Sequence, residues 1–136
     1  MVFIHGGGWI YGSGMMPLYW SDRIANDLSG MVVVTINYRL GALGWLVADG
    51  LEDYNFGFTD QQMAMKWVKS NIVAFNGDPA RVTIAGQSAG GISVSAHLTA
   101  PSSYPYFNQA IIQVRPSPLR LLARLFTHTF FRVDHL

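Results

Sequence analysis

The sequence predicts an α/β fold built on a mostly parallel sheet with helices on both faces. Short apolar runs rich in β-branched residues alternate with longer segments of helical periodicity. The expected order is strand, helix, strand, long loop, helix, strand, helix, strand, and such alternation is typical of parallel sheets. The length of 136 residues allows one domain with a real core.

The expected strands lack strict alternation, as is typical of strands covered on both faces. They fall at residues 1–4, 31–36, 82–85 and 110–114. Ser21 is expected to cap a first helix that reaches Leu28 and ends at Gly30. Residues 37–44 are rich in turn formers, and residues 47–58 are expected to be irregular.

The second helix is expected to begin at Thr59, because Thr59 and Gln62 have the form of a capping box. One face of this helix carries the apolar residues Ala64, Trp67, Val68, Ile72 and Phe75. A third helix is expected from Ala89 or Gly90 to about Thr99, just before Pro101. Arg39 and Asp60 are expected to form a partly buried ion pair that stabilises the scaffold.

Composition and charge exclude several classes of function. The formal net charge of +1 gives no reason to expect a nucleic-acid partner. The chain has no cysteine, which excludes disulfides and zinc–thiolate sites. No apolar run has the length of about 18 residues that a transmembrane helix needs, and Met1–Ile4 does not resemble a signal peptide.

The carboxyl-terminal segment differs from the rest of the chain. Residues 115–136 contain four arginines and one aspartate, with no clear turn signals. We interpret residues 1–113 as one partial domain and residues 114–136 as a divergent basic tail foreign to the fold. An alternative is a basic amphipathic helix carrying Leu119, Leu122 and Phe126, which would suit a membrane surface or a partner protein.

The most informative motif is G-x-S-x-G at residues 86–90, placed between an expected strand and an expected helix. In this arrangement the serine occupies a sharp turn, and the glycines allow strand and helix to approach closely. The backbone N–H of Ala89 then lies at a helix N-terminus, where it can stabilise a developing oxyanion. The motif predicts that Ser88 is a nucleophile.

A second motif, His5-Gly6-Gly7-Gly8-Trp9, follows the first expected strand. Glycine runs of this kind supply the other half of an oxyanion hole in serine hydrolases. The two motifs in these contexts together favour a serine hydrolase over an ordinary glycine-rich turn.

The chain resembles the type-B carboxylesterases, relatives of the cholinesterases within the α/β-hydrolase fold. The resemblance covers about residues 2–113 and is carried by residues 3–9, 37–41, 55–61, 67–72 and 77–90. It implies that Ser88 forms the acyl-enzyme and that Gly7, Gly8 and Ala89 donate the oxyanion-hole hydrogen bonds. It further implies that Trp9 walls the acyl side of the substrate pocket, that the substrates are small carboxylic esters, and that neither a cofactor nor a metal is needed.

Three features depart from the family pattern. Gln87 stands where the family usually has glutamate, so a preference for cationic substrates is less expected. The family's opening strands are not found, and the resemblance ends after Gln113. The family's acid and histidine lie far beyond that point, so we expect a fragment of the hydrolase core, truncated at both ends and without these two residues.

The histidines of the chain offer no clear replacement base. His5 lies in the glycine motif and is expected to be structural. His97 would lie roughly 13 Å along the helix from Ser88, too far to accept its proton. His128 and His135, the latter beside Asp134, are the remaining downstream candidates. The sequence therefore favours a serine-type carboxylic ester hydrolase, with a catalytically inactive product or a non-catalytic binding or adhesion relative as the alternative.

Overall fold

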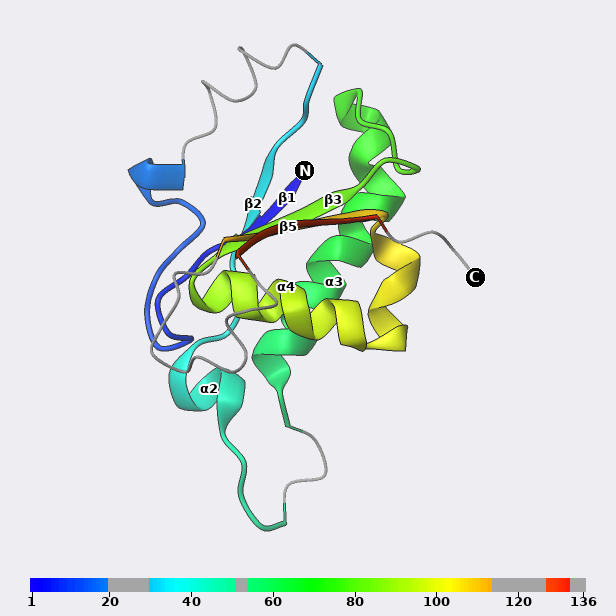
Figure 1. Ribbon diagram of the computed structural model, residues 1–136. Coiled ribbons are helices and arrows are strands. Elements are labelled where there is room, and N and C mark those ends of the chain that lie inside the picture. The colour runs from blue at the N-terminus through cyan, green and yellow to red at the C-terminus, as the bar shows by residue number, and fades with distance from the viewer. Residues whose placement is uncertain (20–29, 51–53, 114–126, 133–136) are drawn as a thin grey trace.

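The computed structural model describes residues 1–19, 30–50, 54–113 and 127–132, the last range as a strand only. Its centre is a sheet with the strand order β2-β1-β3-β4-β5 (Figure 1). The strands are β1 (Val2–Ile4), β2 (Val34–Ile36), β3 (Thr83–Gln87), β4 (Gln109–Gln113) and β5 (Thr127–Arg132). Four of them are mutually parallel and β5 is antiparallel to β4, which confirms the expected mostly parallel sheet.

The observed strands differ from the expected ones at their ends. β2 begins at Val34 and not at Met31, because its partner among the described strands is β1, in which Val2 lies opposite Val34. β3 continues to Gln87, because β4 pairs with it up to that residue. Strand β5 was not expected from the sequence, although its threonines and phenylalanines have high β-propensity.

Two long helices connect the parallel strands. α3 (Phe56–Asn71) leads from β2 towards β3, and α4 (Ala89–Thr99) leads from β3 to β4. Both lie on the same side of the sheet in Figure 1, as right-handed crossovers in the same direction require. The helix expected from Ser21 and the alternative amphipathic helix around Leu122 lie outside the described residues.

Short helical turns complete the described part of the chain. They are η1 (Pro17–Tyr19), α2 (Gly41–Trp45), η2 (Ile72–Phe75) and η3 (Pro101–Tyr106). α2 corrects the expectation of turns throughout residues 37–44. Gly44 is buried in α2, and a Cβ at this position would collide with the carbonyl of Arg39, so no other residue would fit there.

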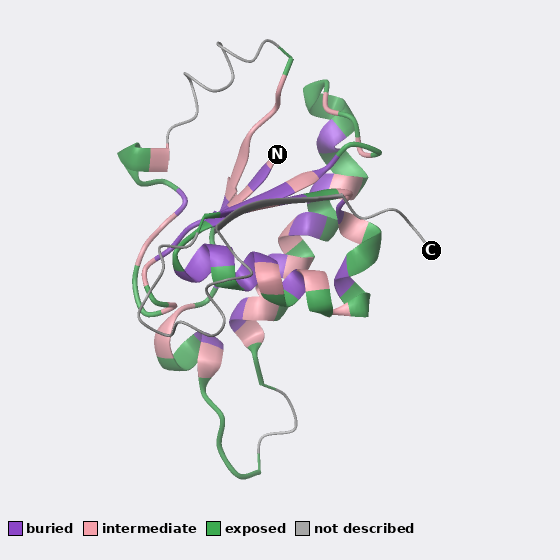
Figure 2. Ribbon diagram, viewed as in Figure 1, coloured by how far each residue is buried: buried purple, intermediate pink, exposed green. Residues whose placement is uncertain are grey.

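The hydrophobic core lies between the sheet and helices α3 and α4, where buried residues gather in Figure 2. Val2, Ile4, Ile84 and Ile112 are fully buried on the strands. Met65 and Val94 cover them from the helices. The large buried apolar surface is the main source of stability for such a layered fold.

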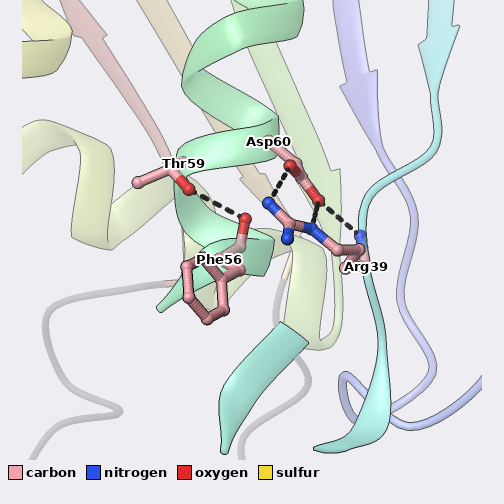
Figure 3. Close-up of polar contacts among 4 residues, drawn as sticks. All are labelled: Arg39, Phe56, Thr59 and Asp60. Carbon is pink, nitrogen blue, oxygen red and sulfur yellow. Dashed lines mark hydrogen bonds and ion pairs between the residues drawn. The ribbon is translucent and has the colours of Figure 1, made fainter. Parts of the chain in front are cut away.

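The amino-terminal end of α3 differs from the capping box expected at Thr59. The helix begins at Phe56, after Asn55 in a left-handed conformation with φ of 62°. Thr59 is inside the helix and donates its hydroxyl to the carbonyl of Phe56 at 3.0 Å (Figure 3). Gln62 does not reach back to Thr59 but donates to the hydroxyls of Ser102 and Ser103. The expected capping box was therefore wrong, because the side chain of Gln62 forms its hydrogen bonds with Ser102 and Ser103.

The buried face of α3 is also displaced from the expected one. Gln61, Met65 and Val68 are buried, whereas Trp67 is 49% exposed. Phe75, in η2, is 56% exposed and contacts Trp67 with ring centroids 6.1 Å apart. The apolar periodicity placed Trp67 and Phe75 on the buried face, but these two residues form an aromatic pair at the surface.

The expected ion pair between Arg39 and Asp60 is confirmed. Nε of Arg39 lies 2.8 Å from Oδ2 of Asp60, and a second guanidinium nitrogen lies 2.8 Å from Oδ1 (Figure 3). The backbone N–H of Arg39 also donates to Oδ2 at 2.9 Å. The hydrogen bonds from Arg39 lower the pKa of Asp60, so this carboxylate fixes the chain after β2 against α3.

Candidate active site

The two glycine motifs lie side by side because they follow neighbouring strands. β1 pairs with β2 on one side and with β3 on the other, so the chain leaves β1 and β3 in opposite directions along the sheet. The carboxyl ends of these two strands therefore form a topological switch point, where α/β proteins commonly bind their ligands. Ile4 at the end of β1 is opposite Gly86 of β3.

Ser88 occupies a strained turn between β3 and α4. Its backbone has φ of 56° and ψ of −124°, a conformation that is costly for a residue with a side chain. Two hydrogen bonds hold it there: its N–H donates to the carbonyl of Gln113 at 2.8 Å, and its carbonyl accepts from Ile92 at 3.0 Å. Ser88 itself is exposed, as the expected nucleophile must be.

Close backbone approaches explain why glycine surrounds Ser88. A Cβ at Gly90 would collide with the carbonyl of Ile4, so α4 lies directly against the end of β1. A Cβ at Gly6 would lie 2.8 Å from the carbonyl of Gln87 and 3.0 Å from Cβ of Ser88. The glycine motif after β1 therefore touches the serine turn after β3.

In the described part of the chain, no protein acceptor is found for the three amides expected to form the oxyanion hole. Within the described residues, no hydrogen bond is donated by the N–H groups of Gly7 or Gly8. Ala89 is the first residue of α4, where helical N–H groups lack an intrahelical acceptor. The carbonyl of Gly7 accepts from Ile10 and Tyr11, which fixes this turn. Of the three residues, Gly8 is exposed, Gly7 is partly exposed and Ala89 is 3% exposed.

A buried hydrogen-bond network links the two motifs. Nε1 of Trp9 donates to Oγ of Ser93 at 3.0 Å, and Oγ of Ser93 donates to the carbonyl of Ala89 at 3.0 Å. Nε2 of Gln61, on α3, also donates to Oγ of Ser93 at 3.2 Å. Ser93 therefore uses its one donor and both acceptor positions. The sequence interpretation missed this serine, although its spacing of four from Ala89 places both on one face of a helix.

His97 extends the network away from Ser88. Its Nε2 lies 3.0 Å from Oε1 of Gln61, and its Nδ1 lies 2.9 Å from Oγ of Ser103. Because Gln61 uses its amide nitrogen to donate to Ser93, its oxygen must accept from a protonated Nε2 of His97. Burial lowers the pKa of His97 to about 4, so the ring is neutral near pH 7. His97 is therefore a buried residue of the core.

His5, the first residue of the glycine motif, is also fully buried. Its ring stacks on that of Tyr38 with centroids 4.5 Å apart, and the hydroxyl of Tyr38 donates to the His5 carbonyl at 2.8 Å. Burial, with a smaller contribution from Tyr19, raises the pKa of Tyr38 to about 12. These contacts support a structural role for His5.

An apolar groove of about 380 Å³ lies beside the glycine motif. It is lined by uncharged residues of the motif and of the segment around α2: Gly8, Trp9, Ile10, Gly41, Ala42, Trp45, Leu46 and Val47. The rings of Trp9 and Trp45 pack with centroids 5.6 Å apart. Gln87, the other residue expected in the substrate pocket, is exposed next to Ser88.

In the described ranges, no group of three or more His, Cys, Asp or Glu residues could hold a metal ion. None of the helices in those ranges is long and apolar enough to span a bilayer.

The sheet, the serine turn and the adjacent glycine motif define the α/β-hydrolase class, and a solved structure supports this assignment. A thermophilic PNB esterase superposes with a TM-score of 0.76 at 44% identity, covering 82% of this chain and 24% of that chain. The chain belongs to the Carboxylesterase family, which it matches over residues 1–117.

Individual relatives agree with this assignment. Cholinesterase of Mus musculus is 47% identical over 115 residues, which are 83% of this chain and 19% of the relative. Esterase E4 of Myzus persicae is 51% identical, with 83% and 20% covered. Crystal protein of Dictyostelium discoideum is 46% identical over 130 residues, with 96% and 23% covered. The chain thus spans about a fifth to a quarter of the length of these curated relatives.

Proposed function

We propose that the chain carries the nucleophile and oxyanion hole of a serine-type carboxylic ester hydrolase. The observation that carries this proposal is the strained, exposed turn at Ser88, against which the loop bearing Gly7 and Gly8 packs directly. Strained backbone of this kind persists at functional sites because the surrounding structure enforces it. The named esterases among the relatives support the same class of reaction.

In the proposed reaction, Oγ of Ser88 attacks the ester carbonyl and its proton passes to a base. The carbonyl oxygen becomes an oxyanion, which the N–H groups of Gly7, Gly8 and Ala89 stabilise. The alcohol leaves with a proton, and water then attacks the acyl-enzyme to release the acid and regenerate Ser88. Each oxyanion-hole donor of this type contributes about 10²–10³ in rate.

The substrates we propose are small uncharged carboxylic esters. Gln87 beside the nucleophile carries no charge, so nothing at this position favours a cationic substrate. Trp9 lines the apolar groove together with Gly8, one of the candidate oxyanion donors, so it would form the apolar wall of the acyl side. An ester bound at Ser88 could therefore place an apolar group against Trp9 without desolvating a charge.

A second candidate function is non-catalytic binding, and one observation favours it for this chain. Among residues whose side chains the structure describes, no histidine or carboxylate forms a hydrogen bond with Oγ of Ser88. A serine hydroxyl without a base is a weak nucleophile. In this second function, the chain would use the same surface to bind a partner protein or an ester without hydrolysing it.

Labelling with a fluorophosphonate distinguishes these functions. Oγ of Ser88 would attack phosphorus and displace fluoride, forming a stable phosphonate ester. The 136-residue chain is compared with Ser88→Ala and with Ser95→Ala, a control serine of the same helix. We expect labelling of the unaltered chain and the control but not of Ser88→Ala. No labelling of a folded, unaltered chain would reject the hydrolase proposal for this chain and favour binding.

A further inference from the structure

We propose that Ser93 is a positioning residue whose hydroxyl holds the two halves of the oxyanion hole in one geometry. This inference rests on the proposed function of Gly7, Gly8 and Ala89. One half of the hole comes from the loop after β1 and the other from the start of α4. The contacts of Ser93 reach both.

The first contact fixes the loop. Trp9 follows Gly8 directly, and its backbone is itself held in the left-handed region with φ of 61°. Its indole N–H donates to Ser93 at 3.0 Å, which links this strained loop to the middle of α4. Backbone hydrogen bonds also hold the residues on either side of Gly8, since the Gly7 carbonyl accepts from Ile10 and Tyr11 and the Trp9 carbonyl accepts from Gly41 at 2.7 Å; the indole tether adds the side-chain link from this loop to α4.

The second contact fixes the helix start. The Ser93 hydroxyl donates to the carbonyl of Ala89, whose N–H is the third candidate oxyanion donor. This carbonyl belongs to the Ala89–Gly90 peptide, so Ser93 holds Ala89 from its carbonyl side, while the preceding peptide, which carries the Ala89 N–H, is held through the Ser88 carbonyl by Ile92 at 3.0 Å. A shift of Ser93 would move both halves of the hole together.

The third contact orients Ser93 itself. Gln61 donates to Oγ from α3, and its own orientation is set by His97 and Ser103. Ser93, Gln61, His97 and Ser103 are all 3% exposed or less. A hydroxyl that accepts from two fixed donors can direct its proton only towards the remaining acceptor, the Ala89 carbonyl. The buried network therefore gives the hydroxyl one orientation.

Ser95 provides a matched control on the same helix. Its hydroxyl donates to the carbonyl of Gly91 at 3.2 Å, the same kind of contact to the residue four positions earlier. That hydroxyl has no contact with Trp9 or Gln61 among its hydrogen bonds in the described structure. Ser95→Ala removes an equivalent helical hydrogen bond without touching the oxyanion hole.

The test uses ¹H–¹⁵N spectra of the full chain, which do not require Ser88 to be reactive. We expect Ser93→Ala to move the amide signals of Gly7, Gly8 and Ala89 and to speed hydrogen exchange at the Trp9 indole. Ser95→Ala should leave these signals near their original positions. Equal perturbation of the Gly7 and Gly8 signals by the two variants would overturn the proposal.

A second variant covers the case in which Ser93→Ala does not fold. Trp9→Phe keeps an aromatic ring but removes the indole donor, breaking the same contact from the loop. We expect the amide signal of Ala89 to shift, although Ala89 is distant in sequence. An unchanged Ala89 signal in folded Trp9→Phe would contradict a coupling through Ser93.

Labelling rates add a functional measurement that separates this inference from the proposed function. If the unaltered chain reacts with the fluorophosphonate, Ser93→Ala should react about tenfold more slowly, because a misplacement of about 1 Å costs about 10²-fold and we expect a smaller shift here. Ser95→Ala should react at the original rate. If the unaltered chain does not react, the proposed function fails for this chain, and the amide signals alone decide the role of Ser93.

Discussion

The indole nitrogen of Trp9 donates a 3.0 Å hydrogen bond to the hydroxyl of Ser93, across 84 positions of the sequence. The contact joins a loop after β1 to the helix that follows the candidate nucleophile. The contribution of this hydrogen bond to stability depends on burial, because a buried donor that loses its acceptor cannot form a hydrogen bond with water instead.

Stability measurements should show that Trp9 and Ser93 are coupled. Ser93→Ala leaves Trp9 and Gln61 without their acceptor, so we expect a loss of about 2 kcal/mol in the free energy of unfolding. Trp9→Phe should cost less in the Ser93→Ala background than in the original chain. Urea denaturation of both single variants and the double variant measures this coupling, expected at about 1 kcal/mol. Strict additivity would contradict it.

The buried His97 should make stability fall at acid pH. Its pKa is lowered from 6.5 to about 4 in the folded chain, so the unfolded chain binds the proton more tightly. The contribution is fully present above pH 6.5 and declines as the pH falls towards 4, by about 3 kcal/mol in total. Equilibrium denaturation at several pH values measures the decline.

His97→Gln provides the control for this pH dependence. Glutamine can still form hydrogen bonds at this site but does not titrate, so the variant should lose less stability than the original chain between pH 6.5 and 4. Parallel curves for the two proteins across this window would show that another group is responsible.

Gly90 should tolerate no side chain, for steric reasons. Gly90→Ala would place a methyl group against the carbonyl of Ile4 and separate α4 from β1. We expect a loss of about 3 kcal/mol in unfolding free energy, at the upper end for overpacking. Gly50→Ala tests a different cause, the loss of the backbone freedom that glycine has at positive φ. Gly50 has φ of 83° but open space around it, so we expect this substitution to cost only about 1 kcal/mol. A thermal melt that ranks Gly50→Ala as the more harmful change would contradict this explanation.

Asp60 should matter more for stability than its partner Arg39. Asp60→Ala removes the acceptor of both the guanidinium and the Arg39 backbone N–H, with an expected cost of about 1 kcal/mol. Arg39→Ala leaves that backbone contact intact and should cost less, since the ion pair is substantially exposed. Chemical denaturation of both variants checks the order, and the reverse order would be inconsistent with the role of the backbone contact.

Much of the fold followed from local sequence. The apolar runs around Ile4 and Ile84 had to be buried, and G-x-S-x-G at residues 86–90 needs a strand before it and a helix after it. These features depend on short-range sterics and solvation, which a single sequence displays directly. The roles proposed for Ser88, Gly7, Gly8 and Ala89 also began as sequence predictions and remain to be tested.

Other features depend on partners far away in the sequence. Thr59 and Gln62 had a correct local pattern for a cap, but Gln62 is used by serines of η3, and the helix begins a turn earlier. Trp67 counted as a core residue by periodicity, yet it pairs with Phe75 at the surface. Periodicity reports which residues share a face, but it does not report which neighbour covers that face.

The sequence by itself determined the strand–turn–helix around Ser88, because the glycines and the apolar strand permit little else there. Only the tertiary structure decided that Ser93, Gln61 and His97 would form one network beneath it. Each of these polar side chains has many possible hydrogen-bond partners in an unfolded chain. Burial between α3 and α4 removes water as a partner and leaves one mutually consistent set of donors and acceptors.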